Sequence, residues 1–287
     1  MTQLVEKQSS GGDQMGNSRS FLVLVAGLIG LTTATNSFGS ALVLLDRDAG
    51  LATVQGKIIF YGPQATEDVA YSAATEVQTY WNGGTDSYPA TQYLSTMIEG
   101  KSYQVIFDIS YQLVSDETAK DMMATSPGPE LTFIQILQGN AANGDRSYMS
   151  DLGANTGVWY LSDDIGKSTT VAHEFGHGMG LAHPVKSDWR GRGQPDIMSP
   201  RGTIVDADYQ WNVNAAAGAA GGTISPYKRR VIQWDINNLQ LSQLNFGYGT
   251  SAALNRPLAE TPWSNEMSNW TGFSLEYHFA PSVGRVY

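Results

Sequence analysis

The sequence predicts an α+β fold, in which strands and helices alternate first and a loop-rich region follows. Residues 102–114, in which apolar and polar side chains partly alternate, and residues 131–139 have the length and composition of β-strands. Residues 65–81 instead carry apolar side chains at four-residue spacing, which is typical of an amphipathic helix. After Pro184 glycine and alanine become frequent, and few strand or helix patterns remain. We therefore expect a sheet with packed helices, followed by an irregular part.

The chain is expected to have three parts. Residues 1–52 comprise a polar leader and an apolar segment, residues 53–246 form the main domain, and residues 247–287 form an aromatic-rich extension. Residues 20–45 contain no charged side chain, so this run is a signal-peptide core, a membrane-spanning segment or a segment packed on the domain. Export or membrane insertion is favoured, which predicts a secreted or cell-surface protein. The region before about residue 50 should then be dispensable for proteolysis.

The main domain contains recognisable elements in a definite order. A helix capped by Ser168 or Thr169 should run to about Met179. A later helix should start at Ser225-Pro226, because serine favours the N-cap and proline the first turn. The expected elements are a strand at 56–62, a helix at 65–81, strands at 102–114 and 131–139, an irregular loop at 140–157, a short strand at 158–163, and helices at 168–179 and 226–239.

Composition excludes several functions for this 287-residue chain. It has no cysteine, which rules out disulfides, thiolate metal sites and cysteine nucleophiles. Its 17 Lys+Arg against 27 Asp+Glu give a formal net charge of −10, so nucleic acid is not an expected partner. Only four histidines are present, and three of them fall within a single short motif.

The motif HEFGHGMGLAHP, at residues 173–184, predicts a metal site. His173 and His177 are four residues apart, so on a helix both imidazoles lie on one face and can share a metal ion. Gly180 can adopt a positive φ and end the helix, which lets His183 approach the same ion. Three histidines and a water form an open tetrahedral zinc site of the catalytic kind. One Zn²⁺ is therefore expected at these three histidines.

Glu174 follows the first histidine directly and is the expected catalytic residue. Zinc lowers the pKa of a bound water to about 7, so Glu174 can take its proton and pass it to a leaving amine. The metal also polarises the scissile carbonyl. The sequence thus predicts a zinc-dependent endopeptidase that acts on proteins or peptides.

The long histidine motif and a methionine after it resemble the metzincin zinc endopeptidases. Met198 lies within DIMSP, residues 196–200, fifteen positions after His183. The resemblance implies that the three histidines are zinc ligands, that Glu174 is catalytic and that Met198 forms a tight turn beneath the metal. Some metzincins have a tyrosine two residues after the methionine, and this chain has Pro200 there.

The metzincin resemblance also implies a detailed architecture. It implies a twisted mixed sheet with two helices in an upper subdomain that ends at His183, and an irregular lower subdomain that ends in a helix. The peptide substrate would lie between them, extended against an edge strand, for which we favour a strand in 146–162. A weaker resemblance, over 169–210 and 221–236, is to metalloprotease domains of Rhs-type polymorphic toxins. Two alternatives follow: a delivered toxin with the same chemistry, and a non-catalytic binding module on this scaffold.

Further polar and aromatic residues near the motif are weaker site candidates. Asp188, Arg190 and Arg192 lie between the third histidine and the methionine, where they could orient the ligands. Solvated loop charges are the favoured interpretation of these three residues. Tyr209 and Trp211 are expected either to line the substrate pocket or to pack in the core.

Three other features complete the candidates. The Asp/Asn/Gly loop at 139–155 could hold a structural Ca²⁺, but its spacing matches no calcium loop and assigns no ligand. Asp13 in the leader could bind the zinc and keep the enzyme latent. His278 is expected at the surface rather than at the metal.

Overall fold

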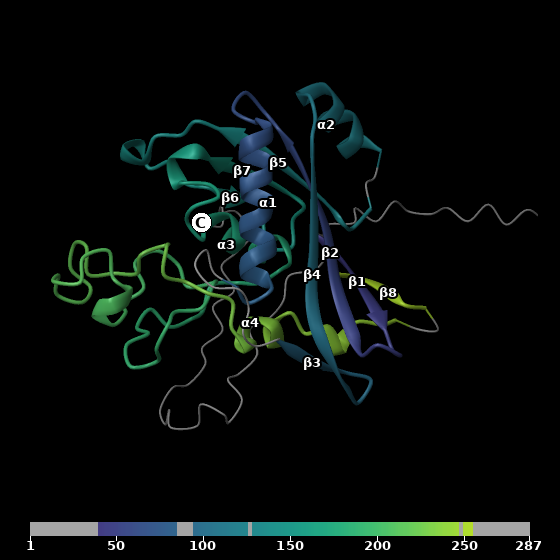
Figure 1. The fold of residues 1–287 in the computed structure, drawn as a ribbon. Coiled ribbons are helices and arrows are strands. Elements are labelled where there is room, and N and C mark those ends of the chain that lie inside the picture. The colour runs from purple at the N-terminus through teal and green to yellow at the C-terminus, as the bar shows by residue number, and fades with distance from the viewer. Residues whose placement is uncertain (1–39, 85–93, 126–127, 247–248, 255–287) are drawn as a thin grey trace, which may run out of the picture. The chain divides into compact units, whose positions relative to one another are not determined.

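A curled mixed β-sheet and four α-helices form the part of the chain that the structure describes (Figure 1). This computed structural model describes residues 40–84, 94–125, 128–246 and 249–254. All of these residues belong to one unit, Asn36–Tyr287. The expected α+β class is therefore confirmed.

The elements follow one another as strands and helices up to α3 and then as loops (Figure 1). The strands are β1 (Ala41–Asp46), β2 (Leu51–Tyr61), β3 (Ser95–Ile98), β4 (Lys101–Leu113), β5 (Leu131–Leu137), β6 (Tyr148–Met149), β7 (Thr156–Tyr160) and β8 (Ser251–Leu254). The helices are α1 (Glu67–Trp81), α2 (Asp116–Ala124), α3 (Thr170–Gly178) and α4 (Gln233–Asn238). The strands predicted at 102–114, 131–139 and 158–163 correspond to β4, β5 and β7.

Strand β2 lies at the centre of the sheet. It pairs in parallel with β4 over ten residues, whereas its other edge is shared by β1 and β5. β1 pairs antiparallel with the first half of β2, and β5 pairs in parallel with the second half. Beyond β5 the order continues to β7 and the two-residue edge strand β6. The helix that carries the motif, α3, follows β7 after a short 3-10 helix at Leu161–Asp163.

The sheet begins earlier than the predicted domain boundary. Strand β1 buries Ala41, Val43 and Leu45, and it pairs with both β2 and β8. The main domain therefore starts before residue 53, and the end of the charge-free run packs into the sheet. The sheet also extends into the expected C-terminal extension through β8. Residues 20–39 lie outside the described part, within which no helix is long and apolar enough to cross a membrane.

Helix α1 confirms the amphipathic helix predicted at 65–81. Its N-cap Thr66 accepts a hydrogen bond from the Val69 amide, and its apolar stripe faces the sheet. Trp81 packs against Phe107 of β4, with ring centroids 5.0 Å apart. Both side chains are completely buried, so α1 and β4 form one rigid base for the elements packed on them.

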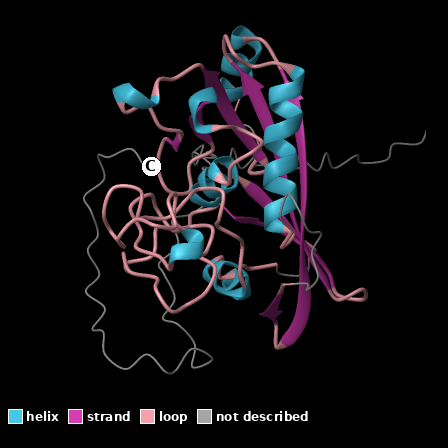
Figure 2. Ribbon diagram, turned by 60° about the vertical axis from the view of Figure 1, so that its left-hand side comes forward, coloured by secondary structure: helices cyan, strands magenta, loops and turns pink. Residues whose placement is uncertain are grey.

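Residues 184–246 contain no strand and are mostly loop (Figure 2). The helix predicted at 226–239 is wrong at its start, because α4 begins only at Gln233 and Ser225 does not cap it. Pro226 instead lies in a turn, and its carbonyl accepts a hydrogen bond from the Thr169 amide at 2.9 Å. Serine and proline favour turns as strongly as helix starts, so the same pair fits both structures.

The loop-rich region shares the main hydrophobic core rather than forming a separate one. Buried residues of this region that join the core of the sheet are Ile197, Met198, Val231, Ile236, Leu239, Leu241 and Phe246. A second, smaller cluster is built from Trp189, Val205 and Ile224. The turn with Met198 is thus fixed by the same core that holds α3.

Candidate metal centre

The end of α3 reverses the chain by a Schellman motif. Gly180 has φ 98°, a conformation that favours glycine. Its amide donates to the carbonyl of His177 at 2.9 Å, and the Leu181 amide donates to the carbonyl of Gly176 at 3.0 Å. The reversal brings His183 back toward the helix, beside the first two histidines of the motif.

The start of α3 is held by α1. The carboxylate of Glu76, on α1, accepts hydrogen bonds from the amides of Gly166 at 2.9 Å and Ala172 at 3.1 Å. The indole N–H of Trp81 donates to the carbonyl of Ala172 at 2.9 Å. Every residue of α3 is buried. These bonds therefore lie in a close-packed interior and fix α3 to α1.

The three histidines converge through their Nε2 atoms. These atoms are 3.1 Å apart for His173 and His177, 3.1 Å for His173 and His183, and 3.0 Å for His177 and His183. The Nδ1 atom of His173 lies 2.7 Å from the carbonyl oxygen of Ile197, and that of His177 lies 2.7 Å from that of Leu181. A carbonyl only accepts, so each Nδ1 carries the proton and each Nε2 presents its lone pair to the centre.

This arrangement fits a metal ion. Two ligand nitrogens at about 2.0–2.1 Å from a tetrahedral zinc lie roughly 3.3 Å from each other, close to the spacing observed here. Lone pairs that face one another repel, and a cation between them removes the repulsion. Burial, together with the charge of Arg229, lowers the pKa of His173 well below its ordinary value, and burial and His183 lower that of His177. Both imidazoles are therefore neutral at pH 7, as metal ligands must be.

Glu174 lies in the wall of the cavity that adjoins the histidines. The cavity has a volume of about 200 Å³ and is lined by His173, His183 and Glu174, among others. Burial raises the pKa of Glu174 well above its ordinary value, whereas Arg229 and a hydrogen bond from the backbone of Met149 oppose the shift. Met149 belongs to β6, so the carboxylate connects the motif helix to the edge strand of the sheet.

Met198 lies in a tight turn next to a residue that holds a histidine. The Ser199 amide donates to the carbonyl of Asp196 at 3.3 Å, which closes the turn around Met198. Met198 itself is buried, and the preceding residue, Ile197, provides the carbonyl that orients His173. The turn therefore contributes packing beneath the helix and a hydrogen bond to the site.

Three arginines also line the cavity, and sequence reasoning missed all of them. Arg146 precedes β6, Arg201 follows the methionine turn, and Arg229 lies between the Pro226 turn and α4. Their charges come from segments that are far apart in the chain. The available signals were the position of Arg201 three residues after Met198 and the Lys-Arg-Arg run at 228–230.

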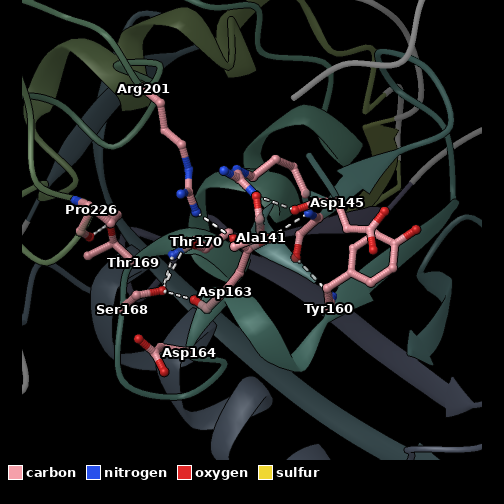
Figure 3. A network of polar contacts seen from close by, with 12 residues as sticks. Ala141, Asp145, Tyr160, Asp163, Asp164, Ser168, Thr169, Thr170, Arg201 and Pro226 are labelled. Carbon is pink, nitrogen blue, oxygen red and sulfur yellow. Dashed lines mark hydrogen bonds and ion pairs between the residues drawn. The ribbon is translucent and has the colours of Figure 1, made fainter. Parts of the chain in front are cut away.

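Asp163 organises the polar contacts beside the cavity (Figure 3). Its Oδ1 forms an ion pair with Nη2 of Arg201 at 2.6 Å, and its Oδ2 accepts a hydrogen bond from the Ser147 amide at 2.7 Å. Its carbonyl accepts from the hydroxyl of Ser168 at 2.9 Å, just before α3. The carboxylate is buried, so it neutralises Arg201 and ties three segments together.

Arg229 is the most buried of the three arginines. It is 2% exposed, and within the described residues no partner lies within hydrogen-bonding distance of its Nε or Nη1. Burial lowers its pKa to about 10, with Arg201 acting in the same direction and Glu174 in the opposite one. The guanidinium is therefore still charged at neutral pH, next to the proposed catalytic carboxylate.

The weaker candidates lie away from the cavity. Asp188 and Arg190 form an exposed ion pair with each other at 2.6 Å, and Arg192 lies over the ring of Trp189 at 5.1 Å. None of these charged residues lines the cavity, so they do not orient the histidines directly.

The aromatic candidates do not line the cavity, whereas the 139–155 loop contributes Arg146 and Ser147 to it. Tyr209 packs on the second hydrophobic cluster, and Trp211 is exposed with its ring against Tyr227. Within the described ranges the three histidines are the only group of three or more His, Asp or Glu side chains near enough to share an ion, so 139–155 gathers no such group. Asp13 and His278 lie outside the described residues.

The chain matches no protein-family model, and no curated protein matches it either. The chemistry of the site is therefore inferred from its own side chains.

Proposed function

We propose that the protein is a zinc-dependent endopeptidase in which His173, His177 and His183 hold one zinc ion and Glu174 is the general base. The observation that carries the proposal is the convergence of three imidazole Nε2 atoms at 3.0–3.1 Å. Glu174 lies in the wall of the adjoining cavity, beside His173 and His183. The long motif and the buried Met198 turn support a metzincin-like enzyme.

Each residue has a separate task in this proposal. The carbonyls of Ile197 and Leu181 keep two imidazoles in the tautomer that binds a metal. When bound there, zinc supplies Lewis acidity and lowers the pKa of water to about 7. The carboxylate of Glu174 accepts the proton of the attacking water and delivers it to the leaving amine. With three protein ligands the site leaves a coordination position free, which is typical of catalytic rather than structural zinc.

The location of the edge strand β6 beside the cavity indicates where a peptide substrate would bind. Strand β6 is the last strand of the sheet on the side of β7, and Arg146 and Ser147 just before it line the cavity. An extended peptide can pair with the free edge of such a strand while its scissile bond lies at the histidines. This agrees with the region favoured from the sequence, 146–162.

The proposal is tested with metal analysis and a general protease assay. The purified protein should contain about one zinc per chain by elemental analysis and should cleave an unfolded protein such as casein. Removal of the metal with a chelator should abolish cleavage, and added zinc should restore it. A zinc-loaded protein that cleaves nothing across a broad substrate panel would favour the non-catalytic binding module instead.

A further inference from the structure

We propose that the cavity beside the histidines binds the side-chain carboxylate of an aspartate or glutamate in the substrate, close to the bond that is cleaved. This inference rests on the proposed function and adds a substrate class to it. It is carried by the charges of Arg146, Arg201 and Arg229, which line one cavity together with His173 and Glu174.

The positive charge of the cavity exceeds what the protein itself neutralises. Asp163 pairs with Arg201 at 2.6 Å. Within the described residues, neither Arg146 nor Arg229 has a carboxylate at ion-pair distance. Nη1 of Arg146 donates to the backbone carbonyl of Ala141 at 3.2 Å, which orients the guanidinium but does not cancel its charge. Glu174 also lines the cavity and attracts Arg229 electrostatically, so three guanidinium charges stand against the two carboxylates of Asp163 and Glu174.

The burial of Arg229 makes this excess unusual. Burial of a charge without a partner costs free energy. Transfer of a guanidinium from water to the protein interior is unfavourable unless an anion compensates its charge. Arg229 is 2% exposed and has two nitrogens without hydrogen-bond partners among the described residues. A carboxylate is the group that guanidinium donors bind best, because its charge and acceptor geometry both match. A ligand carboxylate would supply the hydrogen-bond acceptors that Arg229 lacks.

The size and position of the cavity favour a side chain near the cleaved bond. Its volume of about 200 Å³ is far above the roughly 10–15 Å³ that a single water requires. Because His173, His183 and Glu174 line it too, a side chain held by the arginines belongs to a residue next to the reacting peptide group. A lysine or arginine side chain would be repelled there, and an apolar one would leave Nε and Nη1 of Arg229 without a hydrogen-bond acceptor.

The first test compares matched peptides with the zinc-loaded wild-type protein. The fragments of digested casein, identified by mass spectrometry, should carry an acidic residue at one fixed position beside the cleaved bond. Peptides blocked at both ends should then be made in pairs that differ only as Asp against Asn or Glu against Gln at that position. The acidic peptide should have a kcat/KM roughly ten- to a hundredfold higher, the range of a charge-assisted hydrogen bond.

Variants of the arginines test the assignment. Arg229→Gln should bring the Asp-to-Asn ratio close to one, and Arg201→Gln should lower it. Arg190→Gln is the matched control, because this arginine is exposed, pairs with Asp188 and does not line the cavity. Zinc content and circular dichroism show whether each variant folds. If Arg229→Gln does not fold, the Arg201 variant and the wild-type peptide pairs still show whether the arginines of the cavity cause a preference for acidic peptides.

Three results would overturn the proposal. Equal cleavage of acidic and amide peptides would leave the proposed protease activity standing and refute the arginine-lined pocket for acidic side chains. An equal loss of cleavage for both peptides in Arg229→Gln would mean that the arginine serves Glu174 or the fold. A preference only for peptides with a free C-terminal carboxylate would assign the pocket to a chain end.

A binding measurement separates this proposal from the proposed function. Fluorescence anisotropy with the zinc-loaded protein measures the affinity of labelled Asp and Asn peptides even if neither is cleaved. Tighter binding of the Asp peptide that Arg229→Gln abolishes, without cleavage, would support the pocket and refute the protease. Equal binding of both peptides together with no cleavage would refute both.

Discussion

The backbone of Gly176 lies so close to the sulfur of Met198 that a Cβ atom added to the glycine would be 2.4 Å from it. Gly176 lies on α3 between the first two histidines of the motif, and Met198 lies in the turn that orients His173 through Ile197. The helix and the turn are therefore packed without space for one methyl group.

Gly176→Ala should destabilise the protein by about 1–3 kcal/mol, because the added methyl group overpacks the contact with Met198. The change in urea midpoint at constant slope measures this loss. The double variant Gly176→Ala/Met198→Ala should lose less stability than the sum of the single variants, because it removes the clash. A Gly176→Ala variant as stable as the wild type would show that helix propensity outweighs the contact.

His183→Ala should lose most of the zinc and keep the fold. His183 lies outside α3 and is half-buried, whereas the helix that carries the other two histidines is held by α1. Two ligands instead of three weaken the site strongly. Elemental analysis and circular dichroism on one preparation measure metal and fold together. Full zinc content with full activity in this variant would show that another residue is the third ligand.

Glu174→Gln should lower the rate of cleavage by about 10²–10⁴-fold, the usual contribution of a general acid–base residue. Glutamine keeps the size of the side chain but cannot accept a proton near neutral pH. Zinc content should stay unchanged, because Glu174 is not among the three converging side chains. The casein assay and metal analysis decide: loss of both zinc and activity would make Glu174 a ligand, and retention of both would exclude it as the base.

A chain that begins at Leu51 should fail to fold, contrary to what the sequence alone predicts. It lacks β1, whose Val43 and Leu45 are buried and contribute about 1.5–3 kcal/mol each. This is a large share of the roughly 5–15 kcal/mol that stabilises a typical domain. A chain that begins at Asn36, where the unit begins, is the control and should fold. Zinc binding and cooperative unfolding by the shorter chain would contradict the expectation.

Asp235→Asn should reduce the loss of stability between about pH 4 and neutral pH. Burial, and then the nearby Asp196, raise the pKa of Asp235 well above its ordinary value in the folded protein. The unfolded chain releases this proton near pH 3.9, so the free energy of unfolding falls as the pH rises toward the folded pKa.

Asparagine cannot ionise and can still accept the hydrogen bond from the Ile232 amide, which Asp235 accepts at 2.7 Å. Urea midpoints of the wild type and Asp235→Asn from pH 4 to pH 8 should therefore diverge, with the variant gaining relative stability as the pH rises. Parallel curves for the two proteins would show that Asp235 does not carry this dependence.

The sequence predicted those elements whose pattern is local. Helix α1 follows from an apolar stripe that includes Ala73 and Val77, and strand β4 from alternating residues such as Tyr103 and Val105. The motif similarly encodes a local geometry, since helix spacing and the positive φ of Gly180 need only neighbouring residues. Strand β1 escaped prediction because Ala41–Asp46 lies at the end of a uniformly apolar run, in which no period distinguishes a strand from an anchor.

The parts of the site that could not be predicted depend on contacts between distant segments. Asp163 and Arg201 are brought together by the fold, and neither belongs to a spacing pattern that marks a pair. Ser225 and Pro226 have the residue types of a helix start, but the Pro226 carbonyl is used by Thr169, and α4 starts at Gln233 instead. Tertiary hydrogen bonds of this kind override local propensity.

Ala41 and Leu254 are direct neighbours in the pairing of β1 with β8. The polypeptide therefore enters the sheet and leaves it at adjacent points, although more than two hundred residues separate them. Domains with adjacent entry and exit points tolerate insertion into a host loop and circular permutation, because a short linker can join the two ends. The same unit can thus be carried within a longer polypeptide without stretching its sheet, and a ring closed at this point could be reopened at the exposed turn residues Asp48 and Ala49.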